Sequence, residues 1–377
     1  MIAVLVAGIA AAAIALAASG SSAPHFSFGA VSVVSSPAPK PVLPASDRAS
    51  GPPPFHPAAA AVALAAKLSL PAQVAQLFVV SDDGPSGTPW GGVVLTSGNS
   101  PTDAAAAASS LQGGVAPLVA ATQEGGPETA FPSLPPEGEA TIGVAPQPAA
   151  LARTQAQLAG TKLRALGVNM TLAPLADVDT PGGALTGRLF GTDPALVARL
   201  AVAAVEGYAA AGEISAVGHF PGSGSASADP DQMNATVGGS VGQLEGHDLV
   251  PFAAVAPRAP VIEMSNASYV AFDGVTPAAL LPQAVQLLRR VYRFGGVVMT
   301  DDLDATLNAT GSDPGTVALQ ALKAGDDLLY ITGPPSEHAA AYAAVLAAAQ
   351  RSAAVRALVH AALLRDLTLK ARYGLLH

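Results

Sequence analysis

Eight short apolar segments recur along this chain from about residue 58 onward, and Ala-rich segments separate most of them. Most of the eight are continuous apolar runs, the pattern of parallel strands that helices cover on both faces. The predicted strands lie at 76–80, 91–95, 117–121, 169–175, 215–220, 260–265, 295–300 and 327–332. A chain with this alternation is expected to enclose a parallel sheet in a layer of helices.

The segments between the predicted strands carry helix start and stop signals. The segment 148–167 ends at Gly167, a residue that commonly terminates helices. The segment 193–212 begins with Asp193-Pro194, an N-cap followed by proline in the first turn. Further helices are predicted at 101–112, 281–295 and 313–325.

This alternation predicts a single (β/α)8 barrel of the TIM type over residues 58–377. The chain has 377 residues, 50% of them hydrophobic, which is ample for such a core. The rival fold is a doubly wound open sheet with a nucleotide-binding fingerprint near the first strand. Neither a GxGxxG nor a Walker sequence stands there, so the barrel is favoured.

Polar residues gather directly after the predicted strands, where the active sites of (β/α)8 barrels lie. Solvated loops alone would not require this clustering, which therefore indicates a small-molecule site. The residues are Ser81, Asp82, Asn99, 122–126, Asp177, His219, Asn266, Asp301, Asp302 and Gly333.

The first 57 residues differ from the rest in composition. Residues 1–20 contain an apolar run of about 17 residues, which is short for a membrane span but suits an export signal or an N-terminal anchor. A buried Ala-rich helix is the alternative, because no Lys or Arg precedes the run. Residues 21–57 are rich in Pro, Ser and Ala and predict a disordered linker. We therefore expect an exported protein, extracellular or associated with the cell envelope, with a possible membrane tether.

Composition excludes several classes of function. The net charge is −9 and no basic cluster is visible, so nucleic-acid binding is not expected. The chain has no Cys, which excludes disulfides, thiolate metal sites and a Cys nucleophile. Its 7 His are scattered and no HExxH motif is present, so we expect no metal and no cofactor. We expect a monomer.

The loop sequences resemble glycoside hydrolase family 3, in particular its single-barrel β-N-acetylglucosaminidases. The resemblance covers roughly residues 60–377, and the motifs come in the same order as in the family. They are "LSLPAQVAQLFVV", "PLVAATQEGG", "LRALGVNMTLAPLADVD", "GRLFGTDPALV", "GHFPGSG" and "TPAALLPQAVQLLRRVYRFGGVVMTDDLDA". The ordered set is specific, although each piece alone would be weak.

The resemblance implies a retaining glycosidase, in which one carboxylate attacks the anomeric carbon and a second group protonates the leaving oxygen. It implies that the nucleophile is Asp301, the first Asp of "TDDL". Asp302 would point away, because side chains alternate along a strand, and would cap a helix or hold a loop. The implied substrate-binding residues are Asp177, Arg188, His219, Asn266 and Glu124. For Arg188 a salt bridge at the barrel rim is the alternative, and for His219 a structural role.

The chain departs from the family at the proton donor. The family carries an Asp-Ser-His sequence on a mobile loop, in which His is the acid and base, and this chain has Asp229-Pro230-Asp231 instead. Asp231 can serve as the acid if burial or the Asp301 charge raises its pKa, and Asp229 would help. Glu124 and Glu263 are weaker candidates for the acid.

Other sugar-binding positions differ as well. Gly218 stands where the family has Lys, Ser223 and Asn266 where it has His, and Thr122 where it has Asp, while an Arg after "QEGG" is missing. The favoured function is hydrolysis of a β-linked N-acetylhexosaminide from a cell-wall-type glycan such as peptidoglycan, or from chitin, with a plain β-glucoside as another substrate. One alternative is a glycan-binding pseudoenzyme. A structural or partner-binding barrel without a sugar site is the third.

Overall fold

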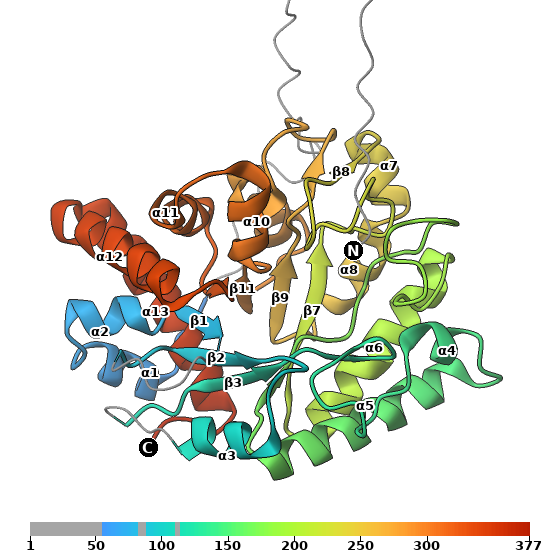
Figure 1. Ribbon diagram of the computed structural model, residues 1–377, viewed down its shortest axis with the longest axis horizontal. Coiled ribbons are helices and arrows are strands. Elements are labelled where there is room, and N and C mark those ends of the chain that lie inside the picture. Colours follow the sequence, from blue (N-terminus) through green and yellow to red (C-terminus); the bar gives the residue numbers. More distant parts are fainter. Residues whose placement is uncertain (1–54, 82–87, 110–113) are drawn as a thin grey trace, which may run out of the picture. The chain divides into compact units, whose positions relative to one another are not determined.

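The computed structural model of the protein describes residues 55–81, 88–109 and 114–377, which form the predicted (β/α)8 barrel (Figure 1). Eight parallel strands pair in the order β11-β9-β7-β6-β3-β2-β1-β12. A bridge between Met299 and Leu328 connects the two ends of this order and closes the ring. The strands are β1 (Phe78–Ser81), β2 (Gly92–Leu95), β3 (Leu118–Ala121), β6 (Met170–Thr171), β7 (Ile214–Phe220), β9 (Val261–Met264), β11 (Val297–Met299) and β12 (Leu329–Ile331).

All eight predicted strands are present, and the largest difference in length is at 169–175. There β6 ends at Thr171, and pairing with β7 resumes only as a bridge between Leu175 and Gly218. Pro174 has no amide hydrogen, so it cannot donate to a strand ladder at this point. The chain leaves the sheet here and carries Asp177 toward the end of the barrel.

The helices surround the strands, and their ends follow the predicted signals. Gly167, with φ 97°, terminates the fifth helix, and the Asp193 side chain accepts a hydrogen bond from the Ala195 amide at the start of the sixth. The α-helices are α1 (Ala59–Ala65), α2 (Leu70–Ala75), α3 (Pro101–Ser109), α4 (Glu139–Gly143), α5 (Pro148–Leu166), α6 (Pro194–Ala210), α7 (Val241–Gly246), α8 (Leu249–Val255), α9 (Pro282–Gln286), α10 (Leu303–Thr310), α11 (Pro314–Ala324), α12 (Pro335–Arg351) and α13 (Ala353–Arg372). The helix predicted at 281–295 is α9 followed by a π-helical segment, Leu287–Val291.

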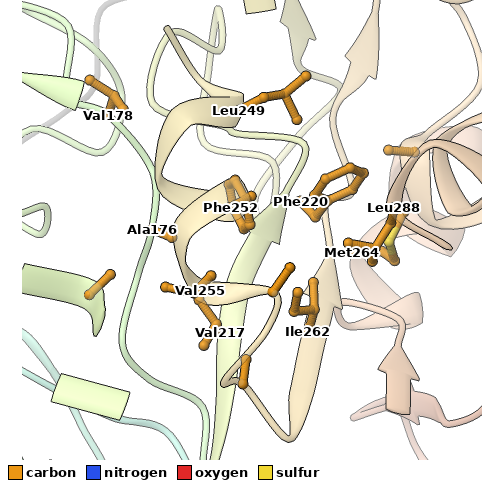
Figure 2. Close-up of a cluster of buried hydrophobic side chains, with 14 of the residues drawn as sticks. Ala176, Val178, Val217, Phe220, Leu249, Phe252, Val255, Ile262, Met264 and Leu288 are labelled. Atoms are coloured by element: carbon orange, nitrogen blue, oxygen red, sulfur yellow. The ribbon is translucent and has the colours of Figure 1, made fainter. Parts of the chain in front are cut away.

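The barrel interior and the layer between strands and helices form separate hydrophobic clusters. Ala216 of β7 and Val261 of β9 belong to the cluster inside the barrel. Their neighbours Val217 and Ile262 belong to the outer cluster and point toward α8 (Figure 2). Phe252 of α8 meets Phe220 edge to face, with ring centroids 5.3 Å apart. Because side chains alternate along a strand, residues two positions further on point to the same face of the sheet.

Short elements extend the loops beyond the carboxyl ends of the strands. A two-stranded hairpin follows β3, made of β4 (Gln123–Gly125) and β5 (Glu128–Thr129). A parallel pair, β8 (Thr236–Val237) and β10 (Ser268–Tyr269), lies beyond β7 and β9 (Figure 1). These elements hold the loops that carry the polar residues of the candidate site.

The predicted leader, 1–20, and all of the predicted linker except 55–57 lie outside the described residues. The described helices include none whose length and hydropathy would suit a membrane span.

Candidate active site

Asp301 follows β11 and is held at the carboxyl end of the barrel by backbone amides. The Asp302 amide donates to its Oδ1 at 2.8 Å, and the Asn266 amide donates to its Oδ2 at 3.4 Å. The residue is only 5% exposed. Fixed donors of this kind favour the ionised form of a carboxyl group, while burial opposes it.

Asp231 lies on the loop between β7 and β8, and its carboxyl group makes a hydrogen bond with that of Asp301. Burial, followed by the Asp231 charge, raises the pKa of Asp301 well above its usual value. Asp231 is an exposed residue, but the desolvation of its carboxyl group in this contact and the nearby Asp229 charge raise its pKa as well. Two carboxyl groups in such contact do not both ionise readily. Instead, the pair shares one proton. The structure thus brings together the two residues that sequence reasoning named as nucleophile and acid.

The loop that carries Asp231 is braced by Asp229 and Arg188. Asp229 accepts hydrogen bonds from the Asp231 amide and from the Gln232 side chain, both at 3.1 Å. Arg188 Nη1 lies 3.8 Å from Asp229 Oδ2. Arg188 also binds Glu124 through two hydrogen bonds, of 3.2 and 2.8 Å. In this conformation Arg188 therefore forms the rim salt bridge that was the alternative to a sugar contact, and Glu124 is its partner.

Asp177 and His219 form a buried pair beside the carboxyl groups. His219 Nδ1 lies 2.9 Å from Asp177 Oδ2, and the backbone amides of His219 and Ser223 also donate to Asp177. Burial opposes a charge on His219, but Asp177 and Asp301 raise its pKa well above the usual value. Asp177 has no exposed surface. It is therefore placed to orient His219 and its loop, and its predicted contact with substrate stays a prediction.

Asn266 and Asp302 fix the start of α10. The Asn266 amide group donates to the Asp302 carbonyl oxygen at 2.7 Å and accepts from the Thr306 hydroxyl at 2.8 Å. The Asp302 carboxyl accepts from the amides of Asp304 and Thr332, and burial raises its pKa to about 6. The structure confirms the capping role expected of Asp302. The Asn266 side chain is engaged within the protein, and its backbone amide is what reaches Asp301.

Glu263 is a third carboxyl group in this cluster, which sequence reasoning kept only as a weaker candidate for the acid. It lies on β9 two residues after the inward-facing Val261, so it also points into the barrel. It is 3% exposed, and burial raises its pKa to about 8. The sequence signal that could have identified it as a site residue is a single Glu within an otherwise apolar strand.

The described part of the chain contains no group of three or more His, Asp or Glu side chains arranged to hold a metal ion. A cavity of about 540 Å³ lies at the opposite end of the strands, beside Pro260 and Val297, and contains none of the predicted site residues. Four arginines line it: Arg258, Arg293, Arg365 and Arg372. The candidate active site is therefore the carboxyl cluster rather than this cavity.

The chain is similar to known glycoside hydrolases over much of its length. Residues 95–369 match the family described as glycosyl hydrolase family 3 N terminal domain. A beta-hexosaminidase of Stenotrophomonas maltophilia is 33% identical over 227 residues, which is 58% of this chain and 67% of that protein. The beta-hexosaminidase LpqI of Mycobacterium tuberculosis is 34% identical over 265 residues, which is 64% of this chain and 66% of LpqI. The matched part thus spans about two thirds of these relatives.

Solved structures show the same likeness. A glycoside hydrolase family 3 beta-N-acetylglucosaminidase from Paenibacillus superposes with a TM-score of 0.75 and 30% identity, covering 82% of this chain and 63% of that one. A beta-N-acetylhexosaminidase from Beutenbergia cavernae superposes with a TM-score of 0.72 and 30% identity, covering 81% and 99%.

Proposed function

Because this chain belongs to glycosyl hydrolase family 3, we propose that it is a retaining β-glycosidase with Asp301 as nucleophile and Asp231 as general acid and base. The contact between these two carboxyl groups at the end of the barrel is the observation that carries the proposal. A retaining glycosidase needs two carboxyl groups at the scissile bond, one ionised and one protonated. A pair that shares one proton meets this requirement.

Both pKa values are raised, so the pair retains a proton, and we assign that proton to Asp231 when a substrate binds. Two backbone amides donate to Asp301 and favour a negative charge there, while His219 favours a negative charge on both carboxyl groups. The Asp231 carboxyl makes its hydrogen bond with Asp301 itself, and the neighbouring Asp229 disfavours a charge on it. Asp231 is therefore suited to be the acid and Asp301 to be the nucleophile.

The reaction then follows in two displacements. The Asp301 carboxylate attacks the anomeric carbon while Asp231 gives its proton to the departing glycosidic oxygen, so that the carbon–oxygen bond breaks and a glycosyl ester forms. Asp231, now ionised, takes a proton from water as that water attacks the anomeric carbon. The ester bond to Asp301 breaks, and the sugar is released with its original configuration.

The acid has to move for a sugar to enter. The two carboxyl groups of a retaining enzyme lie about 5 Å apart with substrate bound, whereas here they are in hydrogen-bond contact. Asp231 belongs to the loop 221–235, which is rich in small residues and includes Gly222 at a φ of 118°. We propose that this loop swings outward to admit the substrate and returns Asp231 to the glycosidic oxygen.

The substrate class we propose is a β-linked hexosaminide or glucoside of a cell-wall-type glycan. The names of the relatives, beta-hexosaminidase and beta-N-acetylglucosaminidase, support an amino sugar. The composition of residues 1–57 supports export to a compartment where such glycans occur.

The test is turnover of p-nitrophenyl β-N-acetylglucosaminide and β-glucoside by protein lacking residues 1–57, with azide as a second nucleophile. Asp301→Asn should abolish turnover. Asp231→Ala should lower kcat/KM about 10²- to 10⁴-fold on a disaccharide, and less on aryl glycosides, whose leaving group hardly needs a proton. With azide, Asp231→Ala should release the β-glycosyl azide, because azide attacks the glycosyl ester, as NMR of the product would show.

Asp313→Asn is the matched control, because Asp313 caps α11 on the surface and Asn caps helices equally well. It should retain full activity. An absence of turnover by wild-type protein on both substrates would reject the proposal and favour a glycan-binding pseudoenzyme. Turnover that survives in Asp301→Asn would reject the assigned nucleophile.

A further inference from the structure

The candidate site holds many more acidic than basic groups. Its basic groups are Arg188 and His219, and each already has a carboxylate partner, Glu124 and Asp177 respectively. The carboxyl groups gathered around them are Glu124, Asp177, Asp229, Asp231, Glu263, Asp301 and Asp302. The groups nearest to the reacting position, Asp231, Glu263 and Asp301, share the charge of His219, and none of them forms an ion pair of its own among the described residues. A site of this composition attracts a positively charged ligand.

Glu263 is the member of this group without an evident structural role. It is 97% buried, since only 3% of its surface is exposed, and no described residue gives it a hydrogen bond. Glu124 and Asp177 differ from it, because Glu124 binds the Arg188 guanidinium and Asp177 binds the His219 imidazole. Its oxygens are not among the fully enclosed polar atoms that lack a partner, so they remain accessible to a ligand.

Gly218 leaves this carboxyl group uncovered on the side of β7. A Cβ atom at position 218 would lie 3.4 Å from Glu263 Oε2, so any side chain there would stand against that oxygen. Gly218 directly precedes His219, and Glu263 acts electrostatically on both His219 and Asp301. The uncovered oxygen thus belongs to the region where a sugar bound to Asp301 would lie.

Resting on the proposed glycosidase function, we propose that the site takes a β-linked sugar with a free, positively charged amino group, and that Glu263 binds this ammonium. A 2-amino-2-deoxy sugar places the nitrogen on the carbon next to the one that Asp301 attacks, hence among these carboxyl groups. An ammonium supplies up to three charge-assisted hydrogen bonds and offsets the excess negative charge. An N-acetyl group or a hydroxyl group supplies no charge and leaves the cluster uncompensated.

The experiment compares p-nitrophenyl β-glucosaminide, β-N-acetylglucosaminide and β-glucoside on wild-type protein and on Glu263→Gln. Wild-type kcat/KM should be at least 10-fold higher on the glucosaminide than on the other two. An ammonium lowers the raised pKa of Glu263 and lets it ionise, whereas Glu263→Gln keeps the shape of the side chain but cannot ionise, so it should reduce this preference about 10- to 100-fold. The half-buried Glu206, which pairs with Arg153 on the outside of the barrel, gives the control Glu206→Gln, which should keep the preference intact.

Binding without turnover separates this inference from the proposed function. Calorimetric titration of the Asp301→Asn variant with glucosamine and with N-acetylglucosamine should show tighter binding of glucosamine. If no glycoside is hydrolysed but glucosamine binds preferentially and Glu263→Gln abolishes this, the proposed function fails and the inference stands. If the N-acetylated or neutral sugar is preferred, or Glu263→Gln affects all three alike, the inference is overturned. Gly218→Ala, which covers the same oxygen, replaces Glu263→Gln if the latter unfolds.

Discussion

At the scale of single residues, Asp177 favours the charged form of His219 in the candidate site. Three donors converge on its carboxyl group, and the ring of His219 is the one that carries charge. The pKa of His219 is raised in the folded protein by Asp177 and Asp301, against the effect of burial. This pair therefore stabilises the fold fully below the unfolded pKa of His, about 6.5. The contribution is lost as pH rises through the higher folded-state pKa.

The variant Asp177→Asn tests this account. At pH 6 it leaves a buried imidazolium without its carboxylate, and we expect it to lower the free energy of unfolding by about 3–5 kcal/mol. The deficit should shrink as pH approaches 10, because neutral His219 no longer needs the charge. Urea denaturation at both pH values measures it, with Asp313→Asn as the surface control. An equal deficit at every pH would show that the carboxylate matters only as a hydrogen-bond acceptor.

At the scale of elements, helix α8 anchors the strands that carry the site. Phe252 of α8 packs on Phe220 of β7, which directly follows His219 (Figure 2). We expect Phe252→Ala to cost about 3–5 kcal/mol in the free energy of unfolding, because a fully buried aromatic ring is lost. Val144→Ala, at a side chain that is 85% exposed, should change stability by less than about 0.5 kcal/mol. Chemical denaturation measures both, and similar effects would refute a central role for this contact.

The elements were more predictable from the sequence than the site. Apolar runs mark buried parallel strands, and Asp193 and Gly167 mark helix ends, because these signals act within a few residues. The π-helical turn at Leu287–Val291 has no such local signal. The contact between Asp231 and Asp301 depends on the path of a loop of small residues, which composition does not determine. The identity of the partners of Asp177 and Arg188 likewise arises only when distant strands assemble.

At the scale of the whole molecule, buried carboxyl groups occur well beyond the site. Burial raises the pKa of Glu139, Glu213 and Asp326 well above their usual values. For each group the folded protein retains a proton that the unfolded chain has already released. Unfolding therefore releases protons above about pH 4.5, the region where unfolded carboxyl groups are ionised. Stability should accordingly fall as pH rises from this value through the raised pKa values.

Glu213 allows this to be tested away from the candidate site. Neither of its carboxyl oxygens has a hydrogen-bond partner, and it is 1% exposed at the start of β7. We expect the free energy of unfolding of the wild-type protein to decrease between pH 5.5 and pH 9, with a slope of up to about 1.4 kcal/mol per pH unit for each such group. Glu213→Gln cannot ionise, so its slope should be shallower, and it should gain stability relative to wild type as pH rises. Urea denaturation across this range measures the free energy of unfolding of both proteins. Parallel curves would mean that Glu213 ionises as freely in the folded protein as in the unfolded chain, and would contradict this prediction.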